Sequence, residues 1–205
     1  MIEGIASLYR LKEQPRQGWL LRGVAGPESV ADHSWGTALL CTVYAEQAGV
    51  DRSRAVEIAL VHDLAEAITG DVPTRVATMN DDRVVAEKRR SELGAMTTLT
   101  GELDRATRLH ITALWHEYEE RATAEGLFVR DMNLIDMLLQ AYVYEADRRY
   151  DQDDSSHFDD YAGMDEFFAT SVARLSTPIG RTLYDEIARV YAALPTVAAR
   201  GGFCV

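Results

Sequence analysis

The stretch that decides the fold is IALVHDLAEAI, residues 58–68. Its apolar residues follow a helical pattern, yet His62 and Asp63 stand in the middle of it. A buried carboxylate needs compensation, because an unpaired charge in apolar surroundings costs several kcal/mol. Adjacent side chains on a helix diverge by about 100°, but both can reach one ion that lies beside the helix. A buried Asp63 that caps a neighbouring turn, with His62 as its hydrogen-bond partner, would also explain the pair.

A second amphipathic helix is expected just before it, over residues 30–48. Ser29 with Asp32 is a predicted N-terminal capping pair, and Gly49 is a predicted stop. Residues spaced three and four apart form an apolar stripe: Val30, Trp35, Ala38, Leu39, Thr42, Val43 and Ala45. His33 lies near the start of this helix, where it would either face the His62–Asp63 pair or bond a backbone carbonyl. Two imidazoles and a carboxylate suit Mn, Fe, Co or Zn better than Mg or Ca.

Helical patterns fill most of the remaining chain. We expect helices over 52–68, 81–99, 102–122, 126–150, 161–175 and 179–193. The helix over 52–68 has Asp51 or Ser53 as its cap and ends at Gly70, and GDVPT (70–74) forms a turn. The acidic segment DQDDSSHFDD (151–160) is expected to be a solvated loop, and no segment shows the alternation of a strand. The prediction is an all-α globule of about eight helices.

Composition limits the classes of protein that fit. The chain has 205 residues, 47% of them apolar and 26% charged, which is typical of a soluble globular protein. No apolar run approaches the roughly 20 residues that cross a bilayer, and no secretory signal is evident, so we expect a cytoplasmic protein without a membrane partner. The net charge of −12 argues against duplex nucleic acid as a partner. Cys41 is expected in the core and Cys204 at the surface, without a disulfide.

A fourth ligand would have to come from the later helix FVRDMNLIDMLLQAYVYEAD, residues 128–147. Asp131, Asn133 and Asp136 lie among apolar residues there. Asn133 and Asp136 are three residues apart and therefore share a face. The alternative is that these groups form the solvent-facing side of the helix.

These motifs together resemble a known family. GWLLRGVAGPESVADHSW (18–35), ALVHDLAEAITGDVPT (59–74), LWHEYEE (114–120) and FVRDMNLIDMLLQAYVYE (128–145) are similar to the HD-domain phosphohydrolases, in the branch that holds the bacterial 5′-deoxynucleotidases. The match runs from about residue 8 to 150, within a single HD domain over 1–205 whose C-terminal helices span 158–195. The resemblance implies one divalent ion held by His33, His62 and Asp63.

The fourth ligand of the family is an Asp, and its position falls on Asn133 in this chain. An amide oxygen can still bind a metal ion, but it brings no charge, so the ion would be held more weakly. Asp136, one helical turn later, is the competing donor.

The resemblance also assigns residues around the ion. Glu66 and Asp71 match residues that act near the attacking water, although Glu66 would also fit a supporting role and Asp71 a simple turn. Arg16 and Trp19 match a phosphate-binding Arg and a Trp beside the sugar. Arg22 competes with Arg16 for its role, and Trp19 would equally serve as a core anchor. Glu117, in the LWHEYEE motif, is expected to face the pocket, and His110, His116 and His157 are expected to be surface or packing residues.

The implied activity is the release of phosphate from nucleoside 5′-monophosphates, with deoxynucleotides as the expected substrates. The alternatives are a phosphatase on the same scaffold that acts on another phosphorylated small molecule, and a degenerate HD protein that binds without turnover. A purely structural helical dimer module would require the occurrence of His33, His62 and Asp63 together to be a coincidence. The family is often dimeric, so a homodimer is expected.

Overall fold

The computed structural model describes residues 2–150 and 161–202. Within these ranges the chain is helical and forms no strand, which confirms the all-α prediction. Eleven α-helices and one 3₁₀-helix follow one another in the described residues: α1 (Ile2–Leu8), η1 (Tyr9–Lys12), α2 (Gln17–Leu21), α3 (Val30–Ala48), α4 (Arg52–Val61), α5 (Glu66–Thr69), α6 (Asp82–Gly101), α7 (Arg105–Glu120), α8 (Ala124–Ala146), α9 (Asp165–Val172), α10 (Pro178–Ala192) and α11 (Pro195–Ala199). The segment 151–160 and Cys204 lie outside the described residues.

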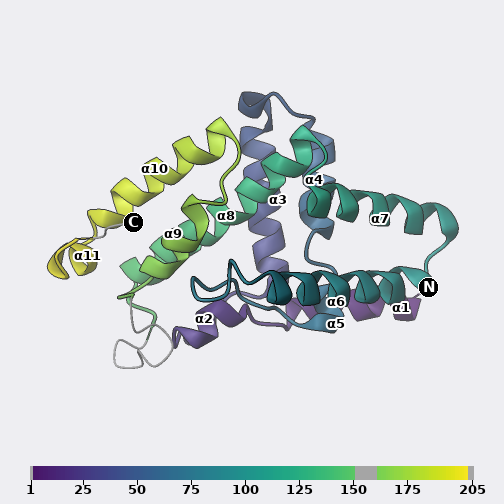
Figure 1. Ribbon diagram of the computed structural model, residues 1–205, viewed down its shortest axis with the longest axis horizontal. Coiled ribbons are helices and arrows are strands. Elements are labelled where there is room, and N and C mark those ends of the chain that lie inside the picture. The colour runs from purple at the N-terminus through teal and green to yellow at the C-terminus, as the bar shows by residue number, and fades with distance from the viewer. Residues whose placement is uncertain (1, 151–160, 203–205) are drawn as a thin grey trace.

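Helix α3 stands near the middle of the molecule, with α4 beside it and α8 crossing it (Figure 1). The predicted caps of α3 are confirmed: Ser29 and Asp32 form a reciprocal capping box, and Gly49 ends the helix with φ of 70°. Asp51 rather than Ser53 caps α4, by accepting a bond from the backbone N–H of Arg54.

The main core lies between α3, α4, α8 and the C-terminal helices, and α8 is its most buried element. Phe128, Met132, Ile135 and Leu138 on α8 are 0–1% exposed, and Cys41 on α3 is buried as predicted. A smaller cluster of Ala65, Ala95, Met96 and Trp115 joins α6 and α7 to the segment before α5.

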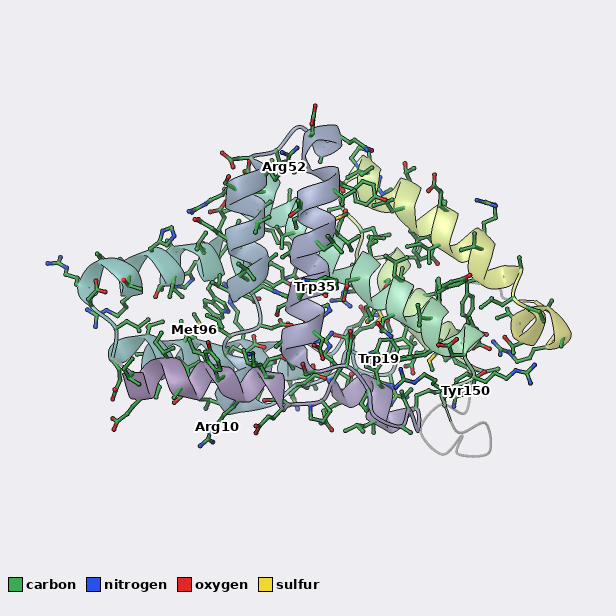
Figure 2. The ribbon with its side chains drawn as sticks, turned by 180° about the vertical axis from the view of Figure 1, so that it is seen from behind. Arg10, Trp19, Trp35, Arg52, Met96 and Tyr150 are labelled. Atoms are coloured by element: carbon green, nitrogen blue, oxygen red, sulfur yellow. The ribbon has the colours of Figure 1, made fainter. Side chains whose placement is uncertain are left out.

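The apolar stripe predicted on α3 is wrong as a single buried face. Val30, Ala38 and Ala45 are buried, but Trp35, Leu39 and Val43 are 67%, 46% and 52% exposed. The reason is angular: residues 35, 39 and 43 lie one above another on the side of the helix away from α8. Trp35 stands on the face that Figure 2 turns toward the viewer.

The continuous helix predicted over 52–68 is also wrong, because α4 ends at Val61 and α5 begins at Glu66. Between them the backbone tightens to bonds three residues apart, from Leu64 N–H to the Val61 carbonyl and from Glu66 N–H to the Asp63 carbonyl. His62 and Asp63 therefore occupy a tight turn at the end of α4.

The C-terminal helices are attached through a buried carboxylate. Asp131 on α8 is fully buried and accepts hydrogen bonds from the backbone N–H groups of Ser176 and Thr177 at 2.7–3.2 Å, and from the Thr177 hydroxyl at 2.6 Å. Thr177 in turn caps α10. Asp131 thus fixes the entry of α10 onto the core.

We predict that Asp131→Ala lowers the free energy of unfolding by about 2–4 kcal/mol, because it strands several buried donors. Urea denaturation followed by circular dichroism would measure this change. Asp131→Asn keeps one acceptor oxygen and should cost less. Equal stability of the native chain and Asp131→Ala would contradict this view of how α10 is held.

Candidate metal centre and active site

Three predicted ligand side chains meet at one point. One donor atom each from His33, His62 and Asp63 lies within 4.8 Å of the other two. The Asp63 Oδ2 atom is 3.7 Å from His33 Nε2 and 3.2 Å from His62 Nε2. His33 comes from the first turn of α3, and the other two come from the tight turn after α4.

The Nδ1 atom of each imidazole has a partner outside the cluster, and this fixes Nε2 as the nitrogen that faces the cluster. His33 Nδ1 lies 2.6 Å from Asp136 Oδ2, and His62 Nδ1 lies 2.7 Å from the Ala59 carbonyl oxygen. A carbonyl oxygen can only accept, so the Nδ1 of His62 is the protonated nitrogen. The Nε2 atoms of both rings are buried and have no hydrogen-bond partner. Two lone pairs that face a carboxylate without a donor between them are what a divalent cation would satisfy.

The side chain of Asp136 therefore does not act as the competing fourth donor that the sequence allowed. It supports His33 from outside the cluster instead of replacing Asn133. Gly36, one helical turn after His33, makes room for it: a Cβ at Gly36 would stand 1.9 Å from Asp136 Oδ1. A glycine at this position is thus required for the carboxylate to reach the ring.

Asn133 lines the same cavity as His62 and Asp63. Its amide nitrogen donates a short hydrogen bond to the Tyr118 hydroxyl. The Tyr118 ring packs against His62, with ring centroids 5.0 Å apart. The amide nitrogen of Asn133 is thus turned to Tyr118, next to His62, in the same cavity.

Arg16 reaches the cluster from the N-terminal segment. A bridge between Pro15 and Ser29 ties this segment to the start of α3. The Nη1 atom of Arg16 is 3.4 Å from Asp63, 3.2 Å from Asp71 and 4.0 Å from Glu66. Asp71 also accepts a bond from the backbone N–H of Gln17, so both of its oxygens have partners in this segment.

Glu66 is the least compensated acid of the site. It is 3% exposed, and its Oε2 atom accepts no hydrogen bond. Burial first, and then the charges of Asp63 and Asp71, raise the pKa of Glu66 to about 9. Burial would also raise the pKa of Asp63, but His62, Arg16 and His33 hold it well below its usual range. The pKa values of these two neighbouring carboxyl groups are therefore shifted in opposite directions.

The remaining predicted positions fall on different sides of the site. Trp19 is 1% exposed, lines the cavity, and donates its indole N–H to Glu28 at 2.8 Å, so it serves both core and pocket. Arg22 is buried elsewhere and donates to the Gly163 carbonyl oxygen. Glu117 does not line the cavity, because it pairs with Arg54 at 2.6 Å.

His110 and His116 are surface residues, in agreement with the prediction of surface or packing positions, and lie on the exposed part of α7 beside Glu57 and Glu120. His157 lies outside the described residues. Tyr118 and Lys88 also line the cavity, and neither was predicted from the sequence. Tyr118 stands inside the LWHEYEE motif, so the motif pointed to the right segment but to the wrong residue.

The cavity beside the cluster has a volume of about 780 Å³. That is within the range of pockets for small ligands. Its lining carries both the acids around His62 and several cationic side chains, including Arg16 and Lys88.

Comparisons with known proteins agree with this geometry. The chain is 37% identical over 145 residues to the 5′-deoxynucleotidase HDDC2 of Danio rerio, covering 71% of this chain and 70% of that protein. It is 39% identical to the human 5′-deoxynucleotidase HDDC2, covering 71% and 68%. A conserved hypothetical protein from Pyrococcus furiosus has a similar structure, with a TM-score of 0.69, 31% identity and coverage of 92% and 99%.

A further solved structure, a predicted metal-dependent phosphohydrolase from Magnetospirillum magnetotacticum, aligns with a TM-score of 0.66 at 26% identity, covering 93% of this chain and 92% of that one. The family described as HD domain matches residues 8–174. The histidines and the His62–Asp63 pair that form the cluster lie within that range. This chain belongs to the HD domain family.

Proposed function

We propose that the protein is a metal-dependent phosphohydrolase that releases phosphate from nucleoside 5′-monophosphates, deoxynucleotides above all. The observation that carries the proposal is the pair of buried, unpartnered Nε2 atoms of His33 and His62 facing Asp63 in a cavity that Arg16 also lines. The relatives that bear the name 5′-deoxynucleotidase support the substrate class.

The proposed ligands are His33, His62 and Asp63, with the amide oxygen of Asn133 as a fourth, neutral donor. One ion of Mn, Co, Fe or Zn fits this mixture of nitrogen and oxygen donors. When bound, such an ion polarises a phosphoryl oxygen and lowers the pKa of a coordinated water. A chain with Asn133 supplies one charge fewer than a chain with Asp there, so we expect weak retention of the metal.

The other residues have roles that follow from their positions. Arg16 is placed to pair with the non-bridging oxygens of the phosphate, and Asp71 with the Gln17 backbone keeps its guanidinium in place. Glu66 has the position and the raised pKa of a proton donor to the leaving alkoxide. Asp71 is then a positioning residue rather than a proton carrier. Trp19, on the wall of the cavity, is proposed to contact the sugar.

Two other readings have a basis in the chain. Fold does not determine substrate, so a phosphatase for another phosphorylated small molecule is the first alternative. A binder without turnover is the second, and Asn133 is the residue that favours it. Both alternatives predict the same metal cluster. The first predicts phosphate release from a different ester, and the second predicts no phosphate release.

We further propose a single domain, a cytoplasmic location and a homodimer. Support for the homodimer comes from Trp35, Leu39 and Val43, which form an exposed apolar row on α3. A sedimentation experiment that gives only monomers would count against it.

Among the described helices, none combines the length and apolar character that crossing a lipid bilayer requires.

The activity test uses purified protein loaded with Mn or Co. We expect phosphate release from dAMP or dGMP, loss of activity in His62→Ala, and a roughly 10²- to 10⁴-fold lower kcat in Glu66→Gln. His110→Ala is the matched control and should behave as the native chain. Activity on a different phosphate ester alone would favour the first alternative, and full activity of His62→Ala would refute the proposed site.

The Glu66 variant comes with its own check of folding. Because the pKa of Glu66 is raised in the folded state, the native metal-free protein loses stability as pH rises from about 4.5 toward 9. Glu66→Gln lacks this loss, so its Tm should equal or exceed that of the native chain at pH 8. A large drop in Tm at pH 8 would mean that lost activity reflects unfolding.

The role of Asn133 is testable by restoring the family's carboxylate. Asn133→Asp should tighten Mn binding by roughly tenfold, because it adds one negative charge to the ligand set. Calorimetric titration would measure the dissociation constants. Gln140→Glu adds the same charge to the same helix outside the cavity, and should leave the constant unchanged. Equal affinity of Asn133→Asp and the native chain would exclude residue 133 from the ligand set.

A further inference from the structure

The cavity has a second cationic region that the proposed chemistry does not use. Arg121 at the C-terminal end of α7, Arg130 on α8 and Arg174 after α9 all line it. Three separate elements of a chain with a net charge of −12 thus bring arginines to one cavity. Like charges that gather in this way repel one another and attract anions.

These cations are poorly neutralised by the protein itself. Arg130 lies 3.8 Å from Glu119, but neither Arg121 nor Arg174 forms an ion pair with any described residue. Burial lowers the pKa of Arg174, and the neighbouring Arg130 and Arg121 lower it further against the opposing effect of Tyr118. Arg130 is the first cause of the lowered pKa of Arg121 and burial the second, while Tyr118, Glu119 and Asp131 act in the opposite direction.

The backbone at Arg121 adds an independent observation. Its φ and ψ are 52° and 38°, the left-handed conformation in which a helix usually ends with glycine. A side chain with a Cβ adopts this conformation at a cost in free energy. The residue that carries one of the three guanidinium groups therefore ends α7 at a cost in backbone free energy, as Arg148, with the same φ of 52°, does after α8.

One aromatic ring separates this cluster from the proposed metal centre. The Cζ atom of Arg130 lies 4.8 Å from the centroid of the Tyr118 ring, and that ring lies 5.0 Å from the ring of His62. A nucleotide whose 5′-phosphate is at the cluster of His33, His62 and Asp63 could therefore extend another anionic group to the arginines within the same cavity.

We propose that Arg121, Arg130 and Arg174 form a second phosphate site, which receives a phosphate group of the nucleotide other than the one that is cleaved. The inference rests on the proposed function, and it adds to that function a preference for nucleotides that carry a second phosphate. That phosphate has two possible sources, the 3′ position of the sugar or a longer 5′ chain. Both present the dianion and acceptor oxygens that guanidinium groups bind in pairs.

The test compares three nucleotides: dAMP, deoxyadenosine 3′,5′-bisphosphate and dADP. Equilibrium binding is measured by calorimetry on the full chain without added metal, and kcat/KM on the Mn-loaded protein. We expect at least one doubly phosphorylated nucleotide to bind roughly tenfold more tightly than dAMP. Preference for the bisphosphate identifies the 3′ phosphate as the source, and preference for dADP identifies the 5′ chain.

Three variants distinguish a role of these arginines in binding the second phosphate from a role in stabilising the fold. Arg174→Gln should remove most of that preference, whereas Arg52→Gln, an exposed arginine on α4, should keep it. Arg121→Gly should reduce the preference and raise the Tm, because it relieves both the backbone strain and the repulsion. A merely structural arginine would not give this combination.

The outcomes are distinct for the two proposals. Absence of phosphate release from all three nucleotides would refute the proposed function, while the binding data still decide the second site. Equal affinity for the three nucleotides in the native chain would overturn the second phosphate site. So would a preference that Arg174→Gln and Arg121→Gly leave intact.

Discussion

The site depends on the hydrogen bonds that hold the Nδ1 atoms of His33 and His62. The hydrogen bonds from His33 to Asp136 and from His62 to the Ala59 carbonyl orient both rings so that their Nε2 atoms face Asp63. Without these outer partners, each ring could rotate to satisfy its own nitrogens, and the cluster would be lost. Three elements supply this arrangement: α3 carries His33, α8 carries Asp136, and the turn after α4 carries His62 and Asp63.

The cluster lies where the backbone at the centre of the chain is irregular. After Val61 the hydrogen bonds tighten from four residues to three, and α4 ends. His62 and Asp63 are adjacent there, and their side chains are long enough to meet, since Asp63 Oδ2 lies 3.2 Å from His62 Nε2. The electrostatic consequence spreads to Glu66, whose pKa is raised in part by the charge that Asp63 retains.

The sequence predicts much of this and fails in particular places. The helical patterns and the capping box at Ser29 could be predicted from spacing, since these are local properties, and the residues of the cluster from the motifs shared with the family. The exposed face of α3 could not, because periodicity shows that apolar residues line up but not which neighbour they meet. The His33–Asp136 pair could not be foreseen either, since 103 residues separate its partners. The three arginines of the cavity could not be predicted either, because Arg121, Arg130 and Arg174 belong to no common motif.

The most direct measurement of the central claim is an anomalous diffraction map of crystals grown with zinc. The account predicts one peak per chain, at about 2.0–2.2 Å from the Nε2 atoms of His33 and His62 and from a carboxylate oxygen of Asp63. A peak bound to other residues, or none near these three donors, would contradict it.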